Sequence, residues 1–278
     1  MRYSILFSTA IILFTFKAIA QQPSVAQIVV HYKFSHVRDT THRDKPYTDN
    51  TVLLIGKGQS VYRRYDQNLQ QALAGQNTKQ PIAKISGNGP SGFAYFQFFR
   101  EKQLTRIEPI LANLFLLKEA LPSMDWKIMP DTATISGFRC QMATTHFKGR
   151  DYTALFCPDL PMPVGPWKLN GLPGVIIEAY DSRKEVSFIF DGIEKIAAAA
   201  EKANQPALND PTVIRVPTNA TPTSEKEFAK LQETFRKDPD AFMRLMSGPQ
   251  GATGGPKMDI KPGPAPVINN PIELPDHK

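Results

Sequence analysis

The chain has 278 residues, of which 41% are hydrophobic and 21% charged, and its 33 Lys and Arg outnumber 26 Asp and Glu. This composition is that of a folded protein and excludes the disordered, collagen-like and disulfide-dense classes. Because the positive charges are scattered and form no Lys/Arg block, we expect no nucleic-acid partner.

Residues 1–20 predict a cleavable signal peptide. Arg2 precedes an apolar run over residues 5–16, and Ala18-Ile19-Ala20 fits a signal-peptidase site. The run is shorter than the roughly 20 residues that a membrane-spanning helix needs, and no second long apolar stretch follows. We therefore expect an exported protein that begins at Gln21 and does not span a membrane. No cysteine stands at the cleavage point, so we expect no lipid anchor.

Residues 21–200 are dominated by short β-branched and aromatic runs, which are typical of strands. The first expected strands cover residues 26–34, 50–55, 60–62 and 93–99, with a polar loop over 36–50 and a short helix over 66–74. Residues 107–120 fit either a helical face or a buried strand, and we predict a strand.

Four more extended runs follow, separated by residues that favour turns. They cover residues 132–147, 152–156, 175–180 and 185–190. Sequential short strands joined by turns predict a mainly β (α+β) fold, a curved antiparallel β-meander sheet.

The chain changes character after residue 200. Within residues 201–248, Ser224 and Glu227 form a capping box before an amphipathic helix, and Asp238-Pro239 begins a second one. Residues 249–278 are rich in Pro and Gly, which predicts an extended tail.

The sequence contains no recognisable catalytic constellation, metal site or cofactor motif. It lacks a Gly-x-Ser-x-Gly elbow, a His-Glu-x-x-His pair and a nucleotide-binding glycine loop. The five histidines show no helical ligand spacing. The eight methionines are dispersed, so we favour core packing over copper binding for most of them.

The most unusual composition lies at residues 158–174, where prolines and glycines alternate around Trp167. Such a run imposes one path on the backbone. One interpretation is a preorganised binding loop, and the other is a crossover that plugs one end of the sheet with Trp167. Candidate binding residues are Trp167, Gly171, Leu172, Pro173 and Gly174, and we expect both glycines to be required by the backbone geometry.

The segment Gly165-Pro166-Trp167-Lys168-Leu169-Asn170-Gly171-Leu172-Pro173-Gly174-Val175-Ile176 resembles the signature of the GLPGLI family of Bacteroidota, with Val175 in place of Leu. The resemblance extends to residues 32–36, 39–41, 56–58, 137–141, 147–150 and 270–274. It implies a secreted cell-envelope protein of a Gram-negative bacterium, without an established activity or catalytic residue. It also implies an accessory role beside a TonB-dependent outer-membrane receptor.

The only two cysteines, Cys140 and Cys157, are expected to meet. If Lys148-Gly149 is a two-residue hairpin turn, Phe147 pairs with Arg150 and Cys140 stands opposite Cys157. Export would place the pair where a disulfide persists, so we predict a bridge. The alternative is a pair of buried free thiols.

Two functions from different classes remain open. The first is a non-enzymatic envelope protein whose curved sheet binds an apolar ligand or a partner protein, which the aromatic density at residues 93–99 and Trp167 favours. The second is an enzyme, for example a hydrolase whose catalytic groups come from distant segments. Copper handling is a third hypothesis, and it requires several Met or His side chains to converge at one site.

Overall fold

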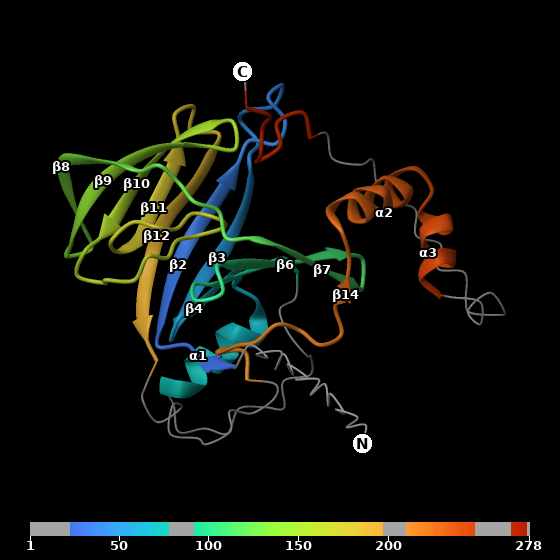
Figure 1. Cartoon of the computed structure of the whole chain (residues 1–278), viewed down its shortest axis with the longest axis horizontal. Coiled ribbons are helices and arrows are strands. Elements are labelled where there is room, and N and C mark those ends of the chain that lie inside the picture. The colour runs from blue at the N-terminus through green and yellow to red at the C-terminus, as the bar shows by residue number, and fades with distance from the viewer. Residues whose placement is uncertain (1–22, 78–91, 197–209, 248–267, 277–278) are drawn as a thin grey trace, which may run out of the picture.

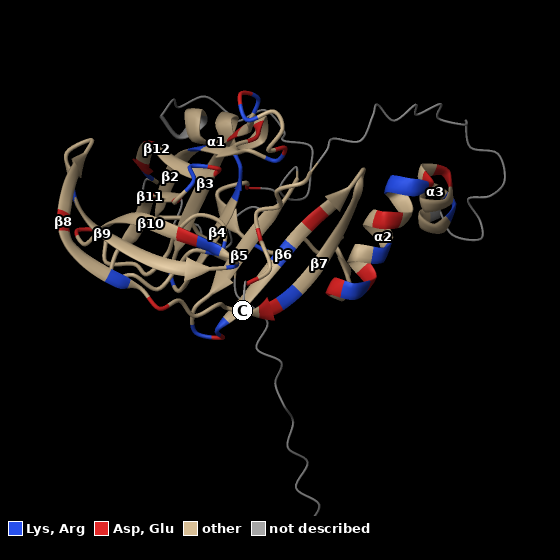
Figure 2. Ribbon diagram, turned by 90° about the horizontal axis from the view of Figure 1, so that it is seen from above, with Lys and Arg blue, Asp and Glu red and all other residues tan. Residues whose placement is uncertain are grey.

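The computed structural model describes residues 23–77, 92–196, 210–247 and 268–276, so the expected leader lies outside the described residues. A mainly β architecture, as expected, is built on one curved 12-stranded sheet (Figure 1). Its strands run in the order β14-β7-β6-β5-β4-β3-β2-β12-β11-β10-β9-β8, and all neighbours are antiparallel except β14 and β7. Figure 2 shows the sheet as an arc from β8 to β7.

Two meanders make up this sheet. The first contains β2 (Ile28–His36), β3 (Tyr47–Gly56), β4 (Gln59–Arg64), β5 (Ala94–Phe98), β6 (Gln103–Ile110) and β7 (Asn113–Ala120). The second contains β8 (Lys127–Ile135), β9 (Phe138–Phe147), β10 (Arg150–Cys157), β11 (Val175–Asp181) and β12 (Val186–Lys195). They join where β2 pairs with β12, which places Phe34 opposite Phe188.

The remaining elements lie around this sheet. They are β1 (Ser24–Val25), which pairs with β13 (Val213–Ile214), then β14 (Thr221–Pro222), α1 (Gln67–Asn77), α2 (Glu225–Lys237) and α3 (Pro239–Ser247). The capping box is confirmed, because Ser224 Oγ accepts from the Glu227 amide and the Glu227 carboxylate accepts from the Ser224 amide. Phe228 of α2 packs on Phe115 of β7, with ring centroids 5.6 Å apart.

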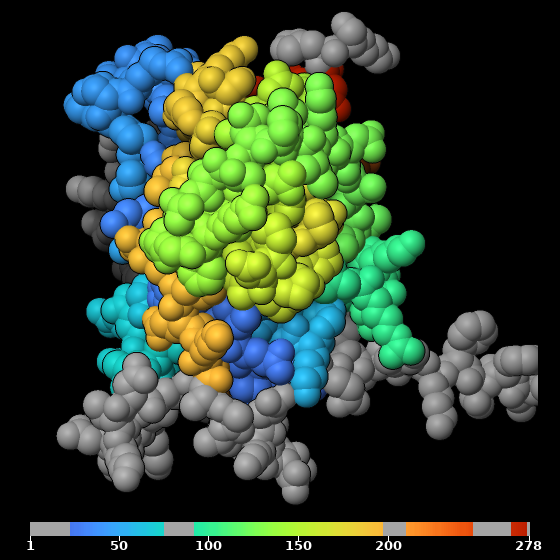
Figure 3. All heavy atoms as spheres, turned by 90° about the vertical axis from the view of Figure 1, so that its left-hand side faces the viewer, coloured from blue at the N-terminus to red at the C-terminus, as the bar shows by residue number. Residues whose placement is uncertain are grey.

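Both faces of the central strands are covered, which explains their continuous apolar runs. In β2, Val30, Tyr32 and Phe34 face one core cluster, shared with β9–β12 and residues 158–174. The adjacent Val29 faces the opposite cluster, which α1 covers with Leu69. Figure 3 views the side formed by β8 and β9 and shows residues 37–46 projecting beyond the sheet at the upper left.

The hairpin between β9 and β10 has the predicted register. Lys148 and Gly149 both have positive φ, 51° and 68°, as a type I′ turn requires, and Arg150 pairs with Phe147. The register continues unbroken to Phe156 opposite Gln141.

The predicted disulfide is nevertheless wrong. Cys140 and Cys157 are both free and buried, because the β9–β10 ladder ends at Phe156 and Gln141, one step before them. On its other side Cys157 pairs with Val175 of β11, and the Cys140 thiol donates to the Phe138 carbonyl at 3.4 Å. Burial raises the pKa of Cys140 to about 11, so the thiol stays protonated. The alternative of two buried free thiols is therefore the one observed.

Residues 158–174 lie over the first core cluster rather than in solvent. Trp167, Leu169 and Leu172 are at most 2% exposed. Gly171 has φ +93°, and a Cβ on Gly174 would lie 2.2 Å from the Cys157 carbonyl oxygen. The two glycines are thus required for different reasons, Gly171 for its backbone conformation and Gly174 for its close packing.

Candidate functional site

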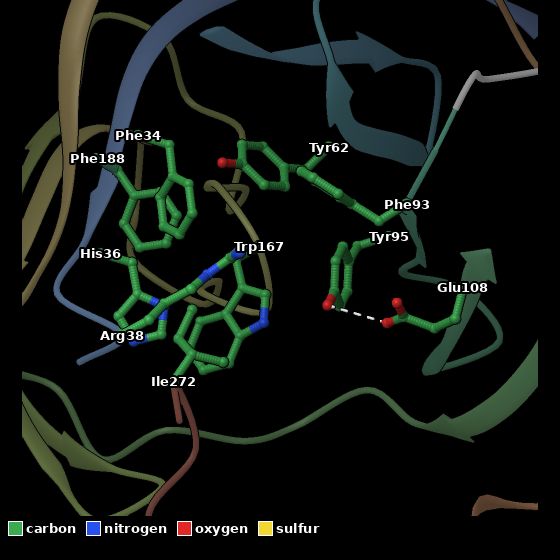
Figure 4. A pocket seen from close by; sticks show the side chains of 10 residues that line it. All are labelled: Phe34, His36, Arg38, Tyr62, Phe93, Tyr95, Glu108, Trp167, Phe188 and Ile272. Atoms are coloured by element: carbon green, nitrogen blue, oxygen red, sulfur yellow. Dashed lines mark hydrogen bonds between the residues drawn. The ribbon is translucent and has the colours of Figure 1, made fainter. Parts of the chain in front are cut away.

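A cavity of about 180 Å³ opens into the first core cluster, and we call it the aromatic pocket. It is lined by Phe34, His36, Arg38, Tyr62, Phe93, Tyr95, Glu108, Trp167, Phe188 and Ile272 (Figure 4). Six of these ten residues are Phe, Tyr or Trp. The pocket lies where the two meanders join, since Phe34 comes from β2 and Phe188 from β12.

Two groups of rings build its wall. Tyr62, Phe93 and Tyr95 lie beside one another, with centroids separated by 6.0–6.4 Å. Phe34 and Phe188 stack at 5.1 Å. Alternation places Phe93 and Tyr95 on the same side of the chain, so a single stretch of sequence supplies two neighbouring rings.

Trp167 lies between these two groups of rings in Figure 4. Contacts with two residues that do not line the pocket fix its position. The Gln97 side-chain amide donates to the Trp167 carbonyl at 3.2 Å, and the Phe147 ring meets the indole edge to face at 5.6 Å. The indole nitrogen is buried and has no hydrogen-bond partner among the described residues. Trp167 is thus fixed in position while its polar atom is left unsatisfied, which is costly unless something compensates.

Glu108 supplies the acidic end of the pocket. It accepts from the Tyr95 hydroxyl at 3.2 Å and lies 3.5 Å from Arg106. Burial raises the pKa of the Glu108 carboxyl, although Arg106 and the Tyr95 hydroxyl act in the opposite direction. The carboxylate is therefore only partly compensated for its loss of water.

This carboxylate belongs to a chain of ion pairs that we call the Glu108 network. Its members are Arg106, Glu108, Glu119, Lys148, Lys168, Glu225 and Glu273. Three cations face four carboxylates, so one acidic group is in excess.

The basic end is formed by Arg38 and His36. The Arg38 guanidinium lies 3.5 Å from the centre of the Tyr47 ring. His36 Nε2 donates to the Asn270 carbonyl at 2.8 Å, which fixes the tautomer. Burial lowers the pKa of His36 to about 4, with Arg150 and Arg38 contributing, so its ring is neutral at pH 7.

Residues 268–276 close the pocket on a further side with Ile272, and Arg150 anchors them. The Arg150 guanidinium donates to the carbonyls of Pro271 and Ile272 and to the Asn270 side-chain oxygen. It also pairs with Asp181 at 2.6 Å and with Glu185 at 3.2 Å. We call Arg150, Asp181, Glu185, Asn270 and Arg43, which pairs with Glu185, the Arg150 cluster.

Of the residues that the sequence suggested for binding, only Trp167 lines the aromatic pocket. Gly171, Leu172, Pro173 and Gly174 do not line it; Leu172 and Gly174 are buried, and Gly171 and Pro173 are exposed. The other nine lining residues were not suggested. They come from six separate stretches of the chain, so no local pattern joins them, and only Phe93 and Tyr95 gave a signal as part of an aromatic strand.

The chemistry of the lining favours binding. The residues that line the aromatic pocket include no Ser, Thr or Cys, and Nε2 of His36 donates to the backbone carbonyl of Asn270. In the part of the chain that the structure describes, no group of three or more His, Cys, Asp or Glu side chains is placed to hold a metal ion. No helix in the same ranges is long and apolar enough to cross a membrane.

Comparisons with known proteins add little. No family model and no curated protein matches the chain. Among solved structures it is similar to PNGF-II in the P21 and C2 space groups, with TM-scores of 0.48 and 0.47 and sequence identities of 11% and 13%. Each match covers 74% of this chain and 32% of the PNGF-II chain, so this chain spans about a third of that protein.

Proposed function

We propose that this protein is an exported, non-enzymatic member of the GLPGLI family that binds a small, largely apolar ligand in the aromatic pocket. Support for export comes from the leader over residues 1–20, and support for the family comes from the signature at residues 165–176. A place beside a TonB-dependent receptor in the cell envelope is the partner that the resemblance suggests.

The observation that carries this proposal is the pocket itself. Packed protein interiors leave few voids larger than a water molecule, whereas this one measures about 180 Å³. A dry engineered cavity of about 150 Å³ is large enough to bind benzene. The aromatic pocket therefore has room for one ring-sized group, and its open side allows the rest of a ligand to extend outward.

Hydrolysis is the weaker alternative because its geometry is missing from the pocket. A hydrolase of the expected kind needs a nucleophile within hydrogen-bond reach of a histidine, which a carboxylate orients in turn. His36 is the only histidine of the pocket, and its Nε2 donates to a backbone carbonyl. Copper handling has no supporting contact among the described residues.

The test is binding of uncharged ring compounds, such as toluene and indole, measured by ligand-observed NMR and by thermal shift. Phe93→Ala removes one wall ring from a half-buried position, and we expect it to weaken binding at least about fivefold. Phe138→Ala is the matched control, because Phe138 is also half-buried but does not line the pocket. No saturable binding by the wild type, or equal effects of both variants, would contradict the proposal.

A further inference from the structure

We infer that the ligand is a zwitterion whose anionic and cationic groups stand at opposite ends of a ring-sized apolar body. This inference rests on the proposed function and names its ligand class. The anionic group would meet Arg38 and the cationic group would meet Glu108.

Arg38 is a cation without an anion. Its guanidinium lies against the face of Tyr47, and no carboxylate among the described residues forms an ion pair with it. The neighbouring His36 is neutral at pH 7, so it adds no competing positive charge. A stacked guanidinium keeps its planar donors free for a carboxylate, which it binds with two parallel hydrogen bonds.

Glu108 is an anion whose charge is only partly balanced by neighbouring cations. Arg106 is its nearest cation, at 3.5 Å, but Arg106 also lies 3.0 Å from Glu119 and pairs with Glu225. Lys168 forms its ion-pair contacts with Glu119 and Glu273 and acts on Glu108 only at longer range. One carboxylate of the Glu108 network is therefore left in excess, and Glu108 is the member that lines the pocket.

The ligand's cation would also meet aromatic faces. Tyr95 donates its hydroxyl to Glu108, and its ring stands beside those of Tyr62 and Phe93. Aromatic faces attract cations within about 6 Å, and more strongly where water is excluded. An ammonium group at this end would thus gain both a carboxylate and a ring.

The two ends are separated by the apolar part of the pocket. Figure 4 shows Arg38 and His36 on one side, Glu108 and Tyr95 on the other, and Trp167 between them. An α-amino acid carries both charges on one carbon and would satisfy a single end. A molecule with a ring between its ammonium and its carboxylate would satisfy both.

The probe is 4-(aminomethyl)benzoate, which has this arrangement. Three matched compounds remove one charge or both: 4-methylbenzoate, 4-methylbenzylamine and 4-methylbenzyl alcohol. Binding to the full chain at pH 7 is measured by isothermal titration calorimetry. We expect the zwitterion to bind roughly tenfold tighter than either singly charged compound, since each end adds a charge-assisted hydrogen bond.

Two variants assign the ends. Arg38→Gln should weaken only the compounds that carry a carboxylate, and Glu108→Gln only those that carry an ammonium group. Lys45→Gln, an exposed cation near Arg38 in sequence, and Glu101→Gln, an exposed carboxylate outside the Glu108 network, are controls that should change nothing. If the alcohol binds as tightly as the zwitterion, or if the variants do not discriminate, the inference is overturned while the pocket remains a binding site. If no compound binds, the proposed function itself fails.

Discussion

The Arg150 cluster and the Glu108 network are both partly buried groups of charges on one side of the same sheet, yet they differ in how completely their charges are paired. In the Arg150 cluster every guanidinium nitrogen of Arg150 donates to an acceptor, and Arg150 and Asp181 side chains are each 2% exposed. Two cations there face two carboxylates. A fully paired charge cluster holds chain segments together, whereas the unpaired charge of an incomplete cluster beside a cavity is what the proposed ligand would meet.

The Glu108 network has an excess of negative charge, and its hydrogen bonds are also less well aligned than those of the Arg150 cluster. Arg106 Nε and Glu119 Oε1 lie 3.0 Å apart, but neither atom has a well-aligned hydrogen bond among the described residues. Asp181 by contrast accepts two backbone amides, from Glu185 at 2.7 Å and from Val186 at 3.1 Å.

The largest effect is expected for Arg150→Met. It leaves Asp181 and Glu185 buried beside a missing cation and frees residues 270–272, so the free energy of unfolding should fall by about 3–5 kcal/mol. Urea denaturation measures the loss. Arg236→Met, which breaks an exposed pair with Glu233 on α2, is the control and should cost less than about 1 kcal/mol. Similar losses in the two variants would contradict the view that the Arg150 cluster holds the fold together.

A smaller loss is expected for Lys168→Met. The Lys168 side chain is only 3% exposed, but its partners Glu119 and Glu273 are 35% and 32% exposed and can recover water. We expect a loss of about 1–3 kcal/mol in the same denaturation experiment. A loss as large as that of Arg150→Met would remove the distinction between the closed and the incomplete cluster.

The smallest effect concerns pH and His36, which lies between the Arg150 cluster and the pocket. Its pKa is about 4 in the folded chain and 6.5 in the unfolded chain, so below pH 6.5 the unfolded state binds the extra proton. Stability is therefore lost as the pH falls from 6.5 to 4. After allowance for solvent screening, the loss is about 2 kcal/mol.

His36→Gln tests this directly because glutamine does not titrate. The groups that face His36 are Arg150, Arg38, Asp181 and the Asn270 carbonyl, and they remain in the variant. Between pH 7 and pH 4 the wild type should lose about 2 kcal/mol more than the variant, measured by urea denaturation at each pH. Parallel curves would show that His36 is not held neutral by burial.

Local signals predicted the local structure well. The capping box at Ser224, the turn at Lys148-Gly149 and the strand over Phe93–Phe99 depend on a few neighbouring residues, and each appears in the structure. Several boundaries were wrong. The run over residues 132–147 breaks at Ser136 and Gly137, and the strand predicted over residues 107–120 breaks at Leu111 into β6 and β7, in each case at positive φ. In addition, β3 begins at Tyr47 within the expected polar loop.

Contacts between distant segments of the chain could not be predicted from the sequence. The disulfide prediction failed although its register was right, because the β9–β10 ladder ends one pair before the two cysteines, which stay free. The pairing of β2 with β12, which brings Phe34 to Phe188, follows from no spacing in the chain. The aromatic pocket depends on that junction, so the sequence could suggest only Trp167 and the aromatic strand that carries Phe93 and Tyr95.

The anchoring of residues 268–276 has a consequence for the order in which the molecule matures. His36 meets Asn270 across 234 positions of sequence, and contacts of such separation form late because the intervening chain must first be brought together. Both meanders can pair before residue 268 is synthesised, but the wall at Ile272 cannot exist until then. A chain cut before residue 268 would therefore keep both meanders but lack Ile272 and the contacts of Arg150 with Asn270 and Pro271, which leaves the aromatic pocket open on that side.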